Sequence, residues 1–89
     1  MNNTIEPQIK NIENHFNNVI GWTPKEFSKL KNQLSCQDYG MAEKKMDQIE
    51  FELFFHSAYG DEIKNLLNHL KDKIIELKLE KEQSKLNNY

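Results

Sequence analysis

The sequence predicts an all-α protein, a small bundle of about four helices in one domain covering residues 1–89. Three observations lead to this fold class. Apolar residues recur at steps of three and four along most of the chain, which is the helical period. No Gly/Ser-rich linker or proline-rich segment interrupts these periods. Hydrophobic residues make up 37% of the chain and charged residues 29%, as in globular domains.

The first helix is expected over residues 6–20. Its apolar face is formed by residues at steps of four and three: Ile5, Ile9, Ile12, Phe16, and either Val19 or Ile20. Pro7 suits the first helical turn, where its missing N–H costs nothing. Gly21 stands where a helix stops, since glycine readily adopts the left-handed conformation that follows a last turn.

A second helix is expected over residues 24–34. Thr23-Pro24-Lys25-Glu26 has the pattern of a capping box, in which the threonine hydroxyl accepts from the Glu26 N–H and the carboxylate reaches back. The helix then presents one apolar side, which consists of Phe27, Leu30 and Leu34. Residues 35–40 read as a connector, because they contain residues that favour caps and turns.

From residue 42 onward the apolar steps of four and three continue without a break, which is heptad spacing. The run consists of Ala42, Met46, Ile49, Leu53, His56, Gly60, Ile63, Leu67, Leu70, Ile74 and Leu77. It fits either one helix of more than 40 residues or two helices, 41–58 and 61–85, that form a hairpin. The hairpin is favoured because Gly60 suits the residue after a helix end and Asp61 suits an N-cap.

Beyond Leu77 the seam fails, since Lys81 and Ser84 stand where a leucine or isoleucine is needed. Residues 78–89 are therefore expected to form a solvated or fraying helical tail that overhangs the bundle. Its lysines complement the negative end of the last helix.

Composition excludes several classes of function. All twelve basic residues are lysine and the net charge is −2, which argues against direct nucleic-acid binding because arginine is the usual reader of phosphate and guanine. No apolar run approaches the roughly 20 residues that span a bilayer. Residues 1–8 lack the basic start and apolar core of a signal peptide, so a cytoplasmic location is expected. Cys36 is the single cysteine and leaves no internal disulfide.

No catalytic constellation is apparent among His15, His56, His69 and Cys36, and we expect no enzymatic activity and no cofactor. Glu52 with His56, and His69 with Asp72, have spacings at which two side chains on a helix could share a metal. Such pairs arise by chance in a polar helical chain, so no metal site is predicted. His56 is expected near the open end of the bundle, and Trp22 as a lid on the core or a contact residue.

Four of the nine aromatic residues fall within residues 51–59: Phe51, Phe54, Phe55 and Tyr59. At about 100° per residue, the three phenylalanines lie off the core stripe that runs through Leu53. Two interpretations remain open. Surrounding helices bury them, which stabilises the fold by roughly 2 to 3 kcal/mol for each one, or they serve as a surface for another chain.

A strip of carboxylates lies beside the core stripe: Glu43, Asp47 and Glu50, continued by Phe54. Residues 38–60 hold five acidic residues against two lysines. The strip is either an ordinary solvated face or an acidic ridge that steers a basic partner toward the aromatic residues.

We therefore expect a protein-binding module that acts as a small stoichiometric inhibitor, of the phage-encoded blocker, immunity-protein or antitoxin type. The predicted contact residues are Glu43, Asp47, Glu50, Phe51, Phe54, Phe55 and Tyr59. The expected partner has a basic surface, such as that of a nucleic-acid-processing protein.

Three other functions are weighed against this one. The heptad seam of residues 63–77 would also suit a structural or adaptor homodimer. A degenerate helix-turn-helix protein is a lesser alternative, because the start of the second helix resembles such a domain but residues 43–55 are too acidic and aromatic for the major groove. A site for a small anionic ligand rests on lysines and helix N-termini alone.

Overall fold

The structure is a computed structural model that describes the backbone of residues 5–87 and the side chains of residues 5–83. This part contains α1 (Glu6–His15), the π-helical turn η2 (Phe16–Ile20), α2 (Lys25–Ser35), α3 (Tyr39–Phe55) and α4 (Asp61–Asn87). No strand occurs between residues 5 and 87. The prediction of an all-α bundle of about four helices is confirmed.

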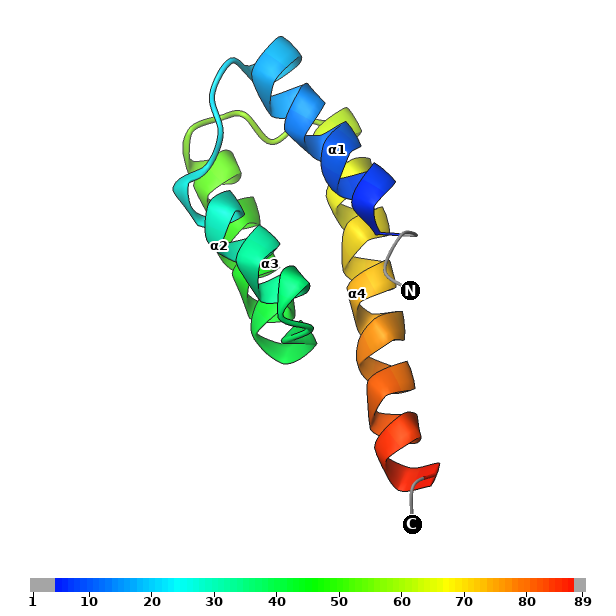
Figure 1. Ribbon diagram of the computed structural model, residues 1–89. Helices are drawn as coiled ribbons and strands as arrows, with labels where there is room; N and C mark the ends of the chain where they lie inside the picture. Colours follow the sequence, from blue (N-terminus) through cyan, green and yellow to red (C-terminus); the bar gives the residue numbers. More distant parts are fainter. Residues whose placement is uncertain (1–4, 88–89) are drawn as a thin grey trace.

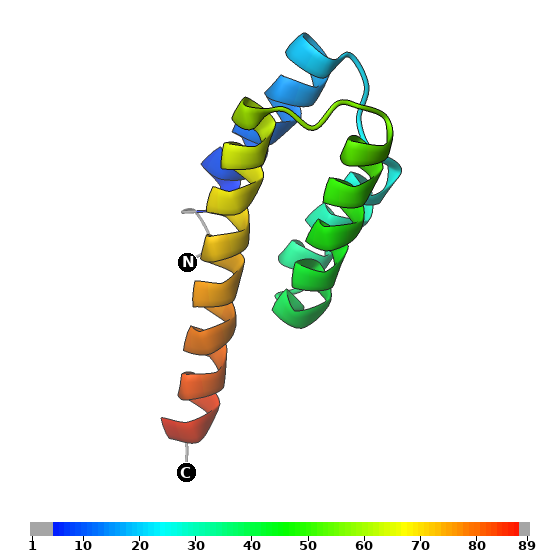
Figure 2. The same cartoon turned by 180° about the vertical axis from the view of Figure 1, so that it is seen from behind.

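The helices are arranged as two neighbouring pairs. Helices α2 and α3 run side by side as a hairpin, α1 lies along the first half of α4, and α3 packs against α4 (Figures 1 and 2). The connections 21–24 and 56–60 lie at the same end of the molecule, at the top of both views. Helix α4 extends past the other helices at its C-terminal end, which gives the molecule a longest dimension of 48 Å.

The apolar periods predicted from the sequence form the core. Twelve of the buried core residues come from three helices: Phe27, Leu30 and Leu34 of α2, Tyr39, Ala42, Met46, Ile49 and Leu53 of α3, and Ile63, Leu67, Leu70 and Ile74 of α4. The Phe16 ring meets the Phe27 ring edge to face at 5.1 Å between centroids, which joins the first helical segment to α2. The long heptad run is therefore divided between two helices of one core.

His56 and Gly60 are exposed, so the run is interrupted where α3 turns into α4. The prediction that His56 occupies a seam position is wrong. Helix α3 ends at Phe55, and a histidine in the following turn no longer continues the stripe of the helix.

The first predicted helix reaches Ile20, but its last turn is wider than an α-helical turn. The Gly21 N–H donates to the Phe16 carbonyl at 2.7 Å, an i→i+5 hydrogen bond, and Gly21 has a φ of +90°. In this wider turn, Phe16 and Ile20 are four residues apart and both face the core. Ile20 accordingly packs against the core, whereas Val19 is 64% exposed.

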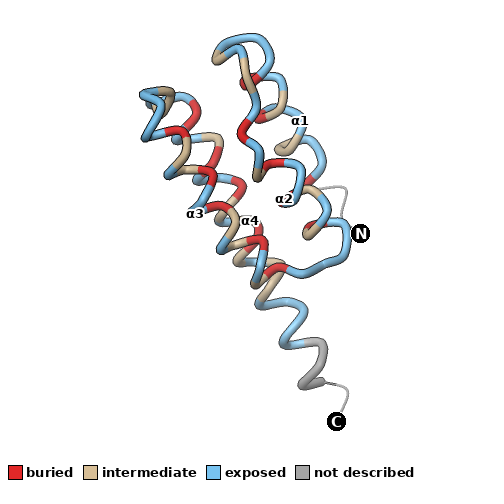
Figure 3. Tube along the Cα trace, turned by 90° about the vertical axis from the view of Figure 1, so that its left-hand side faces the viewer, coloured by how far each residue is buried: buried red, intermediate tan, exposed pale blue. Residues whose placement is uncertain are grey.

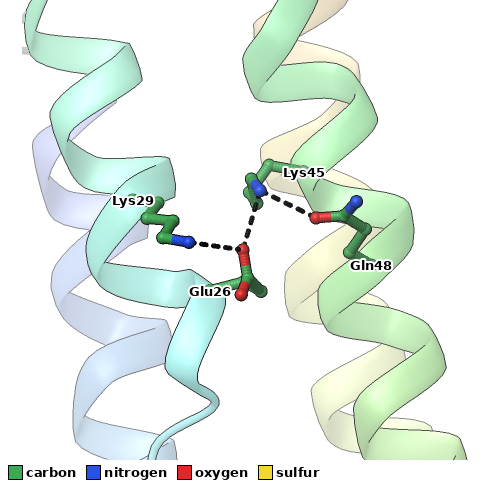
Figure 4. Close-up of polar contacts among 4 residues, drawn as sticks. All are labelled: Glu26, Lys29, Lys45 and Gln48. Carbon is green, nitrogen blue, oxygen red and sulfur yellow. Dashed lines mark hydrogen bonds and ion pairs between the residues drawn. The ribbon is translucent and has the colours of Figure 1, made fainter.

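The predicted capping box at Thr23 is wrong. Pro24 is the N-cap of α2, with a ψ of 143°, and no side chain caps this helix end. Because Pro24 is extended, the helix begins at Lys25. Glu26 is therefore its second residue, whereas a capping box needs the carboxylate at the third. Its carboxylate instead accepts a hydrogen bond from Lys45 of α3 at 2.7 Å and forms an ion pair with Lys29 at 3.8 Å (Figure 4).

The α3–α4 hairpin is confirmed, but its caps differ from those predicted. Ser57, not Gly60, adopts the left-handed conformation, with a φ of 58°. The N–H groups of Ser57 and Ala58 donate to carbonyls in the last turn of α3, a Schellman arrangement. The Gly60 carbonyl accepts from the Lys64 N–H, so Asp61 is the first residue of α4 rather than its N-cap.

The connector before α3 is shorter than predicted. Helix α3 begins at Tyr39, and the Asp38 carboxylate caps it by accepting from the Met41 N–H at 3.4 Å. Gln37, two residues after the end of α2, adopts the left-handed conformation, with a φ of 60°. The third helix therefore covers residues 39–55 rather than 41–58.

The predicted overhanging tail, residues 78–89, begins with residues that touch the rest of the bundle. The Lys78 ammonium lies 3.3 Å from the Glu43 carboxylate, and Lys81 donates to the Gln37 carbonyl at 2.8 Å. Polar contacts with the start of α3 thus continue where the apolar seam ends. Residues 88–89, and the side chains of the tail from residue 84 on, lie outside the described part.

Within the described residues, no helix combines the length and the apolar character required to cross a membrane. Helix α4 is the longest, with 27 residues, but it carries charged residues along its length.

Candidate functional site

Phe51, Phe54 and Phe55 form the outer aromatic patch of α3. Their exposed fractions are 70%, 71% and 71%, whereas the neighbouring Leu53 is fully buried. Phe54 and Phe55 lie three and four residues after Phe51, so the three side chains share the side of the helix that faces away from the core. Buried and exposed positions alternate along α3 in Figure 3. The hypothesis that surrounding helices bury these rings is wrong for this chain.

The aromatic surface continues past the end of α3. The rings of Phe51 and Phe55 stack at 6.4 Å between centroids, and Phe55 meets His56 edge to face at 5.3 Å. His56 in turn meets the indole of Trp22 edge to face at 5.5 Å. These four rings connect the outer aromatic patch to the loop before α2.

The outer aromatic patch is large for so small a chain. A fully exposed phenylalanine presents on the order of 200 Å², so three rings at about 70% exposure present roughly 400 Å². Apolar patches of about 300 to 600 Å² are the largest found on typical monomers and are often functional. A standard protein–protein interface buries about 800 Å² on each partner, so the patch could supply about half of one side.

The three carboxylates of the predicted acidic ridge lie on α3 and meet partners on α4 and in the connection before it. Asp47 accepts from Lys71 at 2.9 Å, and Glu43 lies 3.3 Å from the Lys78 ammonium. Glu50 accepts from the Tyr59 hydroxyl at 3.0 Å. Each predicted ridge carboxylate therefore already has a partner inside the chain.

These contacts also change the acidities of the partner groups. The hydrogen bond with Asp47 raises the pKa of the Lys71 ammonium. Burial, together with the hydrogen bond to Glu50, raises the pKa of the Tyr59 hydroxyl. Because Asp47 and Glu43 are paired with lysines, the predicted acidic ridge carries less unpaired negative charge than the sequence suggests. Asp47 keeps a 66% exposed side chain and remains part of the surface beside Phe51.

The structure adds Trp22 to Glu52 and His56, a pair that the sequence had already placed at helical spacing. Trp22, Glu52 and His56 line a shallow hollow where the loop after η2 meets the last turn of α3. Among the residues that the structure describes, Glu52 makes no ion pair within 4.0 Å. The spacing of Glu52 and His56 placed them on one helix face, but nothing in the sequence pointed Trp22 toward them.

The other candidate chemical groups are dispersed. His15 is buried in α1, with its ring 3.9 Å from the exposed carboxylate of Glu62 on α4. Cys36 is exposed at the end of α2. Within the described part of the chain, no three residues of the His, Cys, Asp and Glu types are grouped closely enough to hold a metal ion.

Comparison with protein-family models, curated proteins and solved structures found no match for this chain.

Proposed function

We propose that this protein is a non-enzymatic binding module that docks its outer aromatic patch onto a basic surface of another protein. In this proposal it acts as a stoichiometric inhibitor, of the phage-encoded blocker, immunity-protein or antitoxin type. A nucleic-acid-processing protein is a suitable partner because such proteins present basic surfaces. The single observation that carries the proposal is the exposure of Phe51, Phe54 and Phe55, each about 70%.

The position of these side chains supports docking rather than a structural role. Phenylalanine contributes to stability when it is removed from water, and these three rings remain mostly in contact with it. They project from a helix whose opposite side is buried against α2 and α4. A partner would therefore meet aromatic anchors on a rigid element, and rigid anchors lose little conformational entropy on binding.

Charge supports a basic partner. Asp47 lies one turn before Phe51, and Glu50 lies one turn before Phe54, so carboxylates border the patch on one side. Lys71 offsets the charge of Asp47 and reduces the expected steering, and we assign most of the affinity to the aromatic rings. Tyr59 is half-buried in this arrangement and is expected to position Glu50 rather than to contact the partner.

The proposal is tested by photo-crosslinking in the source cell. A benzophenone amino acid replaces Phe54 in one variant and Leu79 in a control variant, since Leu79 is an exposed apolar residue of α4 with 53% exposure. We expect one adduct, with a basic protein, from position 54 and none from position 79. The purified partner should then form a 1:1 complex in sedimentation velocity and lose its activity at one equivalent.

Two results would overturn the proposal. Equal crosslinking from positions 54 and 79 would mean that the patch has no special role. A captured protein that does not bind the purified chain in solution would mean that the adduct reflects proximity alone.

Self-association through the outer aromatic patch is the second candidate function. The predicted route through the heptad seam is unavailable, because Ile63, Leu67, Leu70 and Ile74 are buried inside the chain. The stacked pair of Phe51 and Phe55 offers another self-complementary surface. Sedimentation equilibrium at low micromolar concentration distinguishes self-association from docking onto another protein. A dimer that the Phe55→Ser substitution dissociates supports self-association, and a strict monomer eliminates it.

A further inference from the structure

The hollow lined by Trp22, Glu52 and His56 has the composition of a cation site. Glu52 lies in the last turn of α3 and His56 directly follows the end of that helix, while the loop between η2 and α2 brings Trp22 against His56 at 5.5 Å between ring centroids. The two loops that build this end of the molecule lie close together in Figures 1 and 2. The hollow thus combines an indole, an imidazole and a carboxylate.

Electrostatics decides which ligand fits. Glu43, Asp47 and Glu26 are paired with lysines, whereas Glu52 has no ion-pair partner among the described residues. An anion would be repelled by this half-buried carboxylate, and an apolar group would remove it from water without compensation. A metal ion would find only two donor side chains here. An organic cation satisfies the carboxylate and the aromatic faces together.

We propose that this hollow binds an arginine side chain of the protein partner, an inference that rests on the proposed function. A planar guanidinium can stack on the indole of Trp22 while it donates hydrogen bonds to Glu52, which a lysine ammonium cannot do equally well. The hollow is continuous with the outer aromatic patch through the contact of His56 with Phe55 at 5.3 Å. The partner therefore presents an arginine beside an apolar contact on its basic surface.

The experiment uses a peptide probe and does not require the partner. The intact chain is titrated with acetyl-Gly-Arg-Gly-amide at pH 8, and the indole N–H resonance of Trp22 is followed by NMR. Trp22 is the single tryptophan, so this resonance reports on the hollow without assignment. We expect saturable shifts with a Kd on the order of 1 to 10 mM, as for one stacked and hydrogen-bonded side chain.

The controls separate charge, shape and fold. The citrulline peptide has the shape of arginine without its charge and is expected to bind at least about fivefold more weakly to the unchanged protein. Glu52→Gln should weaken the arginine peptide to a similar degree, whereas Glu80→Gln, which removes an exposed carboxylate of α4, should leave it unchanged. Equal melting temperatures of the two variants show that the fold is intact.

Three results would overturn the assignment: no saturable shift, equal binding of the arginine and citrulline peptides, or equal effects of Glu52→Gln and Glu80→Gln. A lysine peptide that binds as tightly as the arginine peptide would contradict the choice of arginine. Failure of the peptide titration removes the arginine site but leaves the outer aromatic patch standing. Failure of crosslinking from position 54 removes the proposed function but does not affect the titration.

Discussion

Two adjacent residues of α3 provide a direct test of which side of this helix is structural. Leu53 is fully buried, whereas Phe54 is 71% exposed, so the larger side chain should matter less to folding. Leu53→Ala removes buried methyl groups and leaves a cavity, which costs about 2 to 5 kcal/mol. Phe54→Ala should cost less than about 1 kcal/mol, because full burial contributes roughly 2 to 3 kcal/mol and less than a third of this side chain is covered.

The assay is urea unfolding at pH 7, followed by the helical circular dichroism signal. With a denaturant slope of about 1 kcal/mol per molar for a small domain, Phe54→Ala should lower the midpoint by less than about 1 M. Leu53→Ala should lower it by about 2 M or more, or leave the chain unfolded in buffer. If Phe54→Ala destabilised the chain as much as Leu53→Ala, the ring would be part of the core and the assignment of the outer aromatic patch would be wrong.

The helix ends and one ion pair give three further predictions. Asp38→Ala should lower stability by about 1 kcal/mol, as for a lost N-cap, whereas Thr23→Ala should change it by less than about 0.5 kcal/mol because no side chain caps α2; urea midpoints compare the two. Ser57→Gly should raise stability by about 0.5 to 1 kcal/mol, since glycine relieves the left-handed conformation, and a lower midpoint would contradict this. The hydrogen bond from Lys45 lowers the pKa of the Glu26 carboxyl, so its stabilisation is present above the ordinary value of 4.5 and is lost as the pH falls through the lowered value. Lys45→Met should therefore raise the pKa of Glu26 in a carboxyl NMR titration and reduce the loss of stability on acidification.

The helices and their buried stripes could be predicted from the sequence because they depend on local spacing. Leu30, Met46 and Leu67 each belong to an apolar run that has the helical period, and each is buried as that period requires. The fate of Phe54 could not be predicted in this way. A helical wheel places it off the core stripe, but only the packing of α2 and α4 shows that no other helix covers that side.

The predictions that were wrong concern residues whose contacts are made between distant segments of the chain. Glu43 and Asp47 look like free surface charges until the packing of α3 against α4 sets Lys78 and Lys71 opposite them. Glu26 has the spacing of a capping residue, but the conformation of Pro24 shifts the start of the helix and Lys45 competes for the carboxylate. These pairings are set by tertiary structure, which single-helix patterns do not contain.

The ion pairs of the acidic ridge change how strongly binding to a partner is expected to depend on charge. Partly exposed ion pairs contribute little to stability, typically up to about 1 kcal/mol each, so a partner could exchange some of them for its own basic groups at modest cost. Asp47 is the best placed for this, since its side chain is 66% exposed next to the patch. Association should then weaken moderately with salt, and the aromatic contacts should persist.

The central claim is that the outer aromatic patch, rather than any exposed apolar residue, binds a protein partner. The most direct measurement is isothermal titration calorimetry. The partner that crosslinking identifies is purified and titrated with the unchanged chain, with the Phe54→Ser variant and with the Leu79→Ser variant. We predict that Phe54→Ser weakens binding by about 30-fold or more, as for a hot-spot residue worth at least about 2 kcal/mol, and that Leu79→Ser stays within about twofold. Equal affinities of the two variants, with both chains folded, would contradict the claim.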